Sequence, residues 1–183
     1  MESAGSLLAS PFQCLTVLDR LPMQASSVFN GGFANILQYN TPILNFKENG
    51  IGYWGDKADW KLDSTTMDDT AAFTTEVALD DEASRNVPIA SFQISPTRLW
   101  QEVKQVTGQA FRLQQLSSLN DFAQFIQKQR ADYPAGENEL YAKWQQGQYL
   151  YSMFTTQHTR LANERYKDLI WSTGVGFIKS FVH

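Results

Sequence analysis

The sequence predicts an α/β fold, because apolar residues at strand spacing alternate along the chain with apolar residues at helix spacing. Ser-Pro pairs mark two helix starts, and Gly-rich turns separate the predicted strands. At 183 residues and 43% hydrophobic composition, the chain is long enough to bury one core. No internal repeat or low-complexity linker divides it, so we expect one unit over residues 1–183.

The first part of the chain predicts a helix, a strand and a sharp turn. Residues 11–21 follow an N-cap serine, begin with proline and should end near Pro22. Their apolar residues recur at helical spacing: Phe12, Leu15, Leu18 and Leu21. Residues 23–33, MQASSVFNGGF, predict a brief strand that enters a turn at Asn30, Gly31 and Gly32. Such a turn is expected at the edge of a pocket.

The central part predicts a hairpin, a helix and a strand. Asn49 and Gly50 favour a type I′ hairpin turn, in which both central residues have positive φ. Residues 64–81 predict a helix capped by Thr65 or Thr66. Its inward-facing residues are expected to be Ala71, Phe73, Val77 and Leu79. Residues 86–94, NVPIASFQI, predict one mostly buried strand.

The remaining part is mainly helical. Ser95 and Pro96 begin a helix that Gly108 ends, with an apolar stripe of Leu99, Val103 and Val106. Residues 109–116 predict a half-exposed strand, and Ser118 caps the next helix. That helix should bury Phe122, Phe125 and Ile126. The last predicted helix carries Leu140, Trp144, Gly147, Tyr151 and Phe154 on one face, where Gly147 would let another segment approach closely.

Composition excludes several classes of partner. The net charge is −4 without a basic block, so we expect no nucleic-acid binding. No apolar run approaches the roughly 20 residues that span a bilayer, and the first residues lack the basic start of a secretory signal, so no membrane association is expected. Cys14 is the only cysteine. A chain without an internal disulfide fits the reducing cytoplasm, which is the expected location.

The stretch GIGYWG, residues 50–55, has the G-x-G-x-x-G spacing of dinucleotide-binding turns, and Asp68 and Asp69 follow at a suitable distance. A phosphate-binding turn needs an apolar strand before it and a helix directly after it. The flanking residues NFKEN and DKADWKLD are polar and lack helical spacing. The hairpin is therefore the favoured interpretation.

The remaining chemical candidates have structural interpretations as well. Asp68 and Asp69 could bind a metal or act in acid-base chemistry, but they also suit the first turn of a helix. Cys14 could be a nucleophile paired with His158, but a cysteine in an apolar helix favours a core position. The aromatic residues near Met153 could line an organic-substrate pocket or fill a core. We predict no metal site and identify no catalytic residue from residue chemistry alone.

Six motifs occur in a fixed order along residues 10–183. They are FNGGF after a strand, YWGD in the predicted hairpin, TTMDDTAAFT at a helix start, QISPTRLWQEVKQVTGQAF, KWQQGQYLYSM and NERYKDLIW. Together they resemble the C-terminal half of the NmrA-like proteins, the isoflavone-reductase-like branch of the atypical short-chain dehydrogenase/reductases. Each motif is loose, and the order carries the resemblance.

The resemblance implies a partial Rossmann-type fold: C-terminal strands and helices plus the substrate-binding subdomain, with the N-terminal dinucleotide-binding half missing. Intact members bind NADP or NAD through a glycine-rich turn near the N-terminus, which nothing before Ser10 supplies. We therefore expect this chain alone to bind neither cofactor tightly. A truncated gene model, a natural short form and an engineered piece would each give such a chain.

The resemblance also implies a pocket. Asn30, Gly31 and Phe33 match the segment beside the nicotinamide and substrate. Trp144, Gln148, Tyr149 and Met153 match the helix that covers the pocket. The expected ligand is a small organic substrate.

The same resemblance leaves three functional hypotheses open. Reductases of this branch use a lysine on the helix before the strand that leads to the turn; here that helix is residues 11–21, and the first lysine is Lys47. The chain is thus expected to be part of an NAD(P)(H)-dependent reductase or redox sensor, or alternatively of a non-catalytic regulator that binds a protein. A third hypothesis is a remnant whose half-sheet exposes an unpaired edge unless a homo-oligomer covers it.

Overall fold

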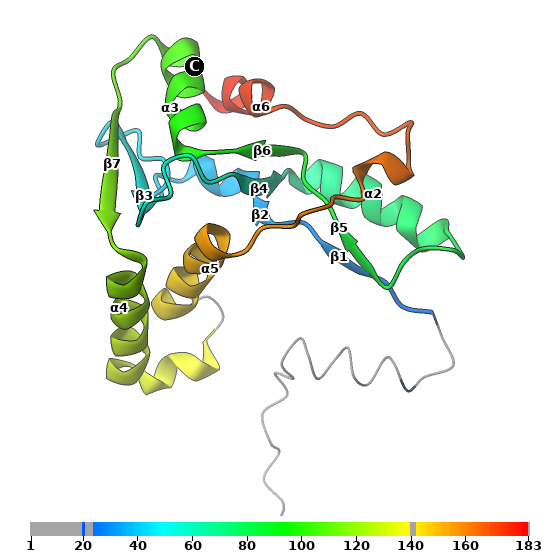
Figure 1. The fold of residues 1–183 in the computed structure, drawn as a ribbon, viewed down its shortest axis with the longest axis horizontal. Helices are drawn as coiled ribbons and strands as arrows, with labels where there is room; N and C mark the ends of the chain where they lie inside the picture. Colours follow the sequence, from blue (N-terminus) through cyan, green and yellow to red (C-terminus); the bar gives the residue numbers. More distant parts are fainter. Residues whose placement is uncertain (1–19, 21–23, 140–141, 183) are drawn as a thin grey trace, which may run out of the picture.

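The computed structural model describes residue 20, residues 24–139 and residues 142–182, and strands alternate with helices as the predicted α/β class requires (Figure 1). The strands are β1 (Ser27–Phe29), β2 (Gly32–Phe33), β3 (Gly50–Trp54), β4 (Leu62–Thr65), β5 (Asn86–Pro88), β6 (Phe92–Ile94) and β7 (Arg112–Ser117). The α-helices are α2 (Met67–Leu79), α3 (Pro96–Thr107), α4 (Leu119–Asp132), α5 (Lys143–Thr155) and α6 (Gly174–Phe181). Short 3-10 helices are η1 (Ala34–Gln38), η2 (Pro134–Asn138) and η3 (Asn163–Arg165).

The strands form three small sheets. β1 pairs with β5 in parallel, and β3 pairs with β7 in parallel. The third sheet has the order β2-β4-β6, with a parallel and an antiparallel pair. Residues 86–94 therefore form two strands in different sheets, not the single strand expected. The chain bends between β5 and β6, where Ala90 exchanges hydrogen bonds with the Asn163 side chain instead of a neighbouring strand.

The predicted helix signals act where the sequence places them. Thr66, and not Thr65, caps α2 by accepting the Asp69 amide at 3.1 Å. Ser95 caps α3 in the same way, and Gly108 ends that helix with a φ of 68°. Ser118 caps α4. These signals are local in sequence, which is why they are confirmed.

The predicted hairpin at Asn49 and Gly50 is wrong. Asn49 has a positive φ of 47°, but Gly50 does not and already belongs to β3. A four-residue turn over 46–49 joins Asn45 to Gly50, which exchange two backbone hydrogen bonds of 2.9 Å. Ile51 is fully buried in β3. The burial of this strand in a parallel pair with β7 outweighs the local preference for a hairpin turn.

Three residues expected inside lie at the surface. Leu79, the last residue of α2, is 78% exposed, and Ala71 is exposed as well. Phe125 on α4 is 54% exposed. In each helix the buried face is narrower than predicted and consists of residues four apart: Phe73 and Val77 in α2, and Phe122 and Ile126 in α4. Leu140, Cys14 and, apart from residue 20, the predicted helix over 11–21 lie outside the described residues.

Two apolar clusters make up the core. The large cluster joins the β2-β4-β6 and β3-β7 sheets to α3, α4, α5 and α6, with Phe154, Ile43 and Leu44 at its fully buried centre. The small cluster lies under α2, against the β1-β5 sheet, and consists of Phe73, Val77, Val87 and Ile89. Figure 1 shows α2, β1 and β5 at one side of the molecule and β3, β7 and α4 at the other. No helix in the described part of the chain is long and apolar enough to cross a membrane.

Candidate functional site

The turn after β1 carries the chain from one sheet to the next. Gly31 has a φ of 59°, and a Cβ there would lie 2.7 Å from the Asp63 Cβ. A Cβ on Gly32 would lie 2.6 Å from the Met153 methyl carbon. Glycine is required at both positions, because the turn is held between β4 on one side and α5 on the other. The Asn30 carbonyl accepts the Thr65 hydroxyl at 2.6 Å and fixes the start of the turn.

Helix α5 brings Tyr149 and Met153 to this turn. The Tyr149 hydroxyl accepts the Phe33 amide at 2.9 Å, although the two residues are 116 positions apart. Burial raises the pKa of Tyr149, and the bond from Phe33 opposes that rise. The phenol is therefore protonated at neutral pH, and among the described residues no acceptor takes its hydrogen. Tyr149 is 38% exposed, so that hydrogen can be donated to a ligand.

The predicted pocket residues separate into two groups. Asn30, Gly31, Phe33, Tyr149 and Met153 gather around the turn. The other two predicted residues, on the first half of α5, lie elsewhere.

Trp144 is 5% exposed and faces α4, where the Arg130 guanidinium lies 4.6 Å from its ring centroid. It borders a hollow of about 540 Å³ between α4 and α5, and its buried indole N–H has no partner among the described residues. Gln148 is exposed on the surface of α5. On a helix, residues five positions apart project about 140° from each other. Trp144 and Tyr149 therefore lie on different sides of α5.

The space beside the turn is narrow. A cavity of about 10 Å³ lies between Phe33, Leu62 and Met153, enough for one water molecule. A ligand would therefore contact the exposed side of Tyr149, unless Phe33 or Met153 moves. On its other side Phe33 borders an open groove over α2.

A carboxylate and imidazole pair lies next to the turn and was missed from the sequence. Asp63 on β4 is 8% exposed and accepts the Gln93 side-chain amide at 2.6 Å. His158 Nδ1 lies 3.1 Å from the same carboxylate, which requires a proton on Nδ1 and leaves Nε2 without a described partner. The Phe29 ring centroid is 6.1 Å from that of His158. An aspartate inside an otherwise buried strand, LDST, was the available signal, because a buried carboxylate needs partners.

The other acidic candidates have structural roles. Asp68 and Asp69 occupy the first turn of α2, as the alternative interpretation predicted. Asp69 accepts the Ser91 hydroxyl and, at 3.0 Å, the Ser172 amide, so it ties α2 to two distant segments. Within the described ranges, no three His, Cys, Asp or Glu side chains are close enough to hold a metal ion.

The GIGYWG stretch does not form a phosphate-binding turn. Gly50 and Gly52 lie within β3, where a Cβ on Gly52 would strike the Pro42 carbonyl oxygen and lie 2.7 Å from Leu116. Gly55 follows in a turn with a φ of 60°, and the chain continues to β4 without an intervening helix. These residues therefore lack the helix that follows the last glycine of a dinucleotide-binding turn.

Comparisons with known proteins support the fold alone. No protein-family model matches the chain, and no curated protein sequence does. Similar solved structures include AtPrR2 in apo form and AtPrR2 with NADP+ and (+)pinoresinol. Each has a TM-score of 0.63 at 18% sequence identity over 85% of this chain, and the match covers 52% and 50% of the AtPrR2 chains. This chain thus shares an α/β fold with about half the length of AtPrR2.

Proposed function

We propose that this chain is the substrate-binding part of an NAD(P)(H)-dependent oxidoreductase or redox sensor of the NmrA-like, isoflavone-reductase-like kind. The contact between the 30–33 turn and α5 carries the proposal, because it joins two distant segments that the resemblance assigns to one pocket. The fold supports it as well, since AtPrR2 has been solved with NADP+ and a small organic ligand.

The residues around the turn can position a ligand oxygen. The Tyr149 hydroxyl is held by the Phe33 amide, and its own hydrogen can be donated to a ligand. The His158 imidazole is held through Nδ1 by Asp63, whose Cβ lies beside Gly31. A phenol donor and an imidazole ring suit a small organic compound with carbonyl or phenolic oxygens.

The described residues do not fit the pyrophosphate of a nicotinamide dinucleotide. Such a group needs a glycine-rich turn that opens a helix, so that backbone amides point at the phosphates. The G-x-G-x-x-G sequence of this chain lies in β3 and the following turn, where protein atoms occupy the space beside Gly52. We therefore propose that this chain alone binds NADPH and NADH weakly or not at all.

Calorimetric titration tests the cofactor part of the proposal. NADPH and NADH titrated into the chain should each give no measurable heat of binding at cofactor concentrations in the micromolar range. A dissociation constant in that range would overturn this part. Cofactor titration does not depend on the substrate site, so the two parts can fail separately.

Ligand titration tests the substrate part. We expect a naphthoquinone or (+)pinoresinol to shift the Met153 methyl signal in NMR spectra, and we expect Tyr149→Phe to weaken that binding roughly tenfold through loss of one hydrogen bond. Gln148→Ala is the matched control, because Gln148 is exposed on the same helix away from the turn. Absence of a Met153 shift, or equal affinity in Tyr149→Phe, would contradict the assignment of the pocket.

The absence of lysine from residues 11–21 favours a second candidate function, a non-catalytic regulator that acts through protein binding. Measurement of turnover distinguishes the oxidoreductase from the non-catalytic regulator. A longer form of the protein that oxidises NADPH with quinone or enone substrates would favour the enzyme, and cofactor binding without turnover would favour the regulator.

A further inference from the structure

A buried carboxylate holds the imidazole of His158 in one orientation. Asp63 Oδ2 accepts hydrogen bonds from two groups of His158, the backbone amide at 3.3 Å and ring Nδ1 at 3.1 Å. The other carboxylate oxygen, Oδ1, accepts the Gln93 side-chain amide at 2.6 Å. The Asp63 side chain is only 6% exposed, so water competes little for these bonds. Both the backbone and the ring of His158 are therefore fixed relative to β4.

The remaining ring nitrogen of His158 is open. When Nδ1 carries the proton of an uncharged imidazole, Nε2 is the basic nitrogen. In the part of the chain that the structure describes, the side-chain polar atoms that are both buried and unpartnered are Glu102 Oε2 and Trp144 Nε1. Nε2 has no partner among the described residues and is not one of these buried atoms, so it reaches solvent. A purely structural tie to Asp63 does not need this open nitrogen.

The pair lies at the turn that also carries Tyr149. Phe29 directly precedes the 30–33 turn, and its ring centroid is 6.1 Å from that of His158. At the other end of the turn, the Phe33 amide donates to the Tyr149 hydroxyl. Four residue steps from Phe29 to Phe33 span at most about 14 Å. The imidazole and the phenol therefore belong to the surroundings of one short turn.

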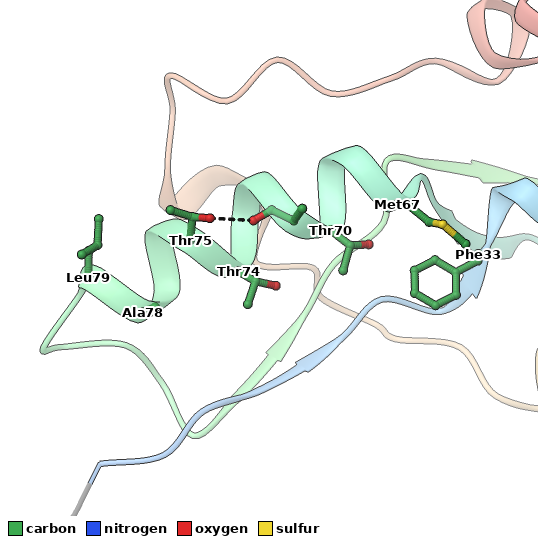
Figure 2. A pocket seen from close by; sticks show the side chains of 8 residues that line it. Phe33, Met67, Thr70, Thr74, Thr75, Ala78 and Leu79 are labelled. Carbon is green, nitrogen blue, oxygen red and sulfur yellow. Dashed lines mark hydrogen bonds between the residues drawn. The ribbon is translucent and has the colours of Figure 1, made fainter.

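The other side of Phe33 offers no acid-base group. Figure 2 shows the groove of about 530 Å³ along α2, with Phe33 at one end and Leu79 at the other. The eight residues that line it are apolar residues and threonines, whose side chains do not titrate. Among the described residues around the turn, proton transfer therefore depends on the Asp63 and His158 pair and on Tyr149.

We propose that His158 Nε2 accepts the proton of a ligand hydroxyl, and that Asp63 and Gln93 are positioning residues for the imidazole. This inference rests on the proposed function, because it names the ligand class of the same site: a compound with an ionisable hydroxyl, such as a phenol or an enol. The O–H bond of the ligand breaks, an Nε2–H bond forms, and the electron pair stays on the ligand oxygen. The Asp63 carboxylate pairs with the resulting imidazolium. Phe29, which is 40% exposed, offers an apolar surface to a ring-bearing ligand.

Absorbance titration of the chain with 4-nitrophenol tests the proton transfer, because only the phenolate form of this probe is yellow. At a pH where the free probe is partly protonated, the bound probe should contain a larger phenolate fraction than the free probe. His158→Gln keeps a donor for Asp63 but removes the basic nitrogen. It should abolish this increase and weaken binding roughly tenfold, through loss of a charge-assisted hydrogen bond. His183→Gln, at the other histidine of the sequence, is the matched control and should keep both properties.

A second probe, 4-nitroanisole, lacks the hydroxyl and should bind the native chain and His158→Gln equally. The proposal would be overturned by any of three results with 4-nitrophenol: no binding at millimolar concentration, an unchanged phenolate fraction, or equal affinity in the native chain and His158→Gln.

Asp63→Asn tests the positioning role. This change removes the charge that pairs with the imidazolium, so the phenolate fraction of bound 4-nitrophenol should fall to that of the free probe, while the affinity for 4-nitroanisole stays the same. Asp59→Asn, at an exposed position before β4, should leave the phenolate fraction unchanged. A native phenolate fraction in Asp63→Asn would contradict the role of the carboxylate. If Asp63→Asn does not fold, the result for the partly exposed His158 decides the proposal.

The same titrations separate this inference from the proposed function. Binding of 4-nitrophenol that Tyr149→Phe weakens and His158→Gln does not would overturn the inference and leave the proposed pocket intact. A phenolate signal that His158→Gln removes and Tyr149→Phe leaves unchanged would support the inference and contradict the assignment of Tyr149 to the ligand site.

Discussion

The large and small apolar clusters differ in how completely the described chain encloses them. The large cluster has sixteen buried residues from two sheets and four α-helices, whereas the small cluster has four buried residues beneath α2. The β1-β5 sheet, which belongs to the small cluster, has strands of three residues each. The outer side of α2 is open to solvent. The small region therefore has fewer buried contacts to stabilise it than the large region.

Truncation of one fully buried phenylalanine in each cluster has the largest expected effect. Phe154 and Phe73 are both 0% exposed, so Phe154→Ala and Phe73→Ala should each cost about 3–5 kcal/mol of local packing free energy. Hydrogen exchange measured by mass spectrometry should show faster exchange throughout the chain in Phe154→Ala. Phe73→Ala should raise exchange mainly in α2, β1 and β5.

A cooperative molecule would behave differently. If Phe73→Ala raised exchange in β3 and β7 as much as in β1, the two regions would unfold together and the comparison would fail. The Trp171 ring centroid lies 5.7 Å from that of Phe73, so Trp171 belongs to the small region.

The next effect concerns Gly31, at the junction of the two regions. Gly31→Ala should lower the free energy of unfolding by about 2 kcal/mol, because the residue keeps a positive φ and its Cβ meets Asp63. Gly108→Ala is the matched control: it has a similar φ of 68° but nothing within 4 Å of its Cβ. Urea unfolding should therefore show a larger loss for Gly31→Ala. Equal losses of unfolding free energy in the two variants would mean that the close approach of the added Cβ to Asp63 causes no further destabilisation.

Sequence reasoning succeeded where the determinants are local. The caps at Ser95 and Ser118 and the helix end at Gly108 depend on residues within one turn of each other, so their spacing alone predicts them. The hairpin failed because Ile51 gains more from burial beside β7 than Asn49 and Gly50 gain from a tight turn.

The candidate site was only partly predictable, because its contacts join distant segments. Phe33 and Tyr149 were named only through the family resemblance. Their contact joins residues 116 positions apart, so the local spacing of apolar residues does not indicate it. The pair of Asp63 and His158 spans 95 residues and was not found. The resemblance placed Trp144 on the helix that covers the pocket, whereas the structure places its ring against Arg130 of α4.

Tyr149→Phe, which alters the contact between the 30–33 turn and α5, has a smaller expected effect on stability. Loss of the acceptor for the Phe33 amide should lower the free energy of unfolding by about 1 kcal/mol. Tyr39→Phe, at a residue that is 73% exposed, should leave stability unchanged. Unfolding curves for the two variants that coincide would show that this hydrogen bond contributes no stability.

The same tyrosine predicts an alkaline effect. Burial raises the pKa of Tyr149 in the folded state, so its stabilising contribution is complete below the unfolded value of about 10 and is lost as pH rises through the folded pKa. Because the pKa values of Tyr133 and Tyr166 are raised as well, spectrophotometric titration should show one fewer late-ionising tyrosine in Tyr149→Phe than in the native chain. Identical titration curves would contradict a buried, protonated phenol at this position.

The smallest expected effect is an acid sensitivity confined to the small region. The Asp80 carboxylate accepts the Tyr166 hydroxyl at 2.8 Å and Arg165 Nε at 2.7 Å, and these bonds hold the pKa of Asp80 below its usual value. A lowered folded pKa means that the contribution is present above the unfolded value of about 4 and is lost as pH falls through the folded pKa. Because the ion pair is partly exposed and screened, the effect should be modest.

Hydrogen exchange in α2 and β5, measured relative to β3 over the acidic range, tests this last prediction. After correction for the intrinsic pH dependence of exchange, α2 and β5 should lose protection before β3 does as pH falls below about 4. Asp80→Asn should lower their protection at neutral pH and flatten its further loss in acid, whereas Asp81→Asn, at an exposed neighbouring position, should keep the native profile. If Asp80→Asn also kept that profile, Asp80 would not tie the end of α2 to η3 and Tyr166, and the small region would depend on apolar packing alone.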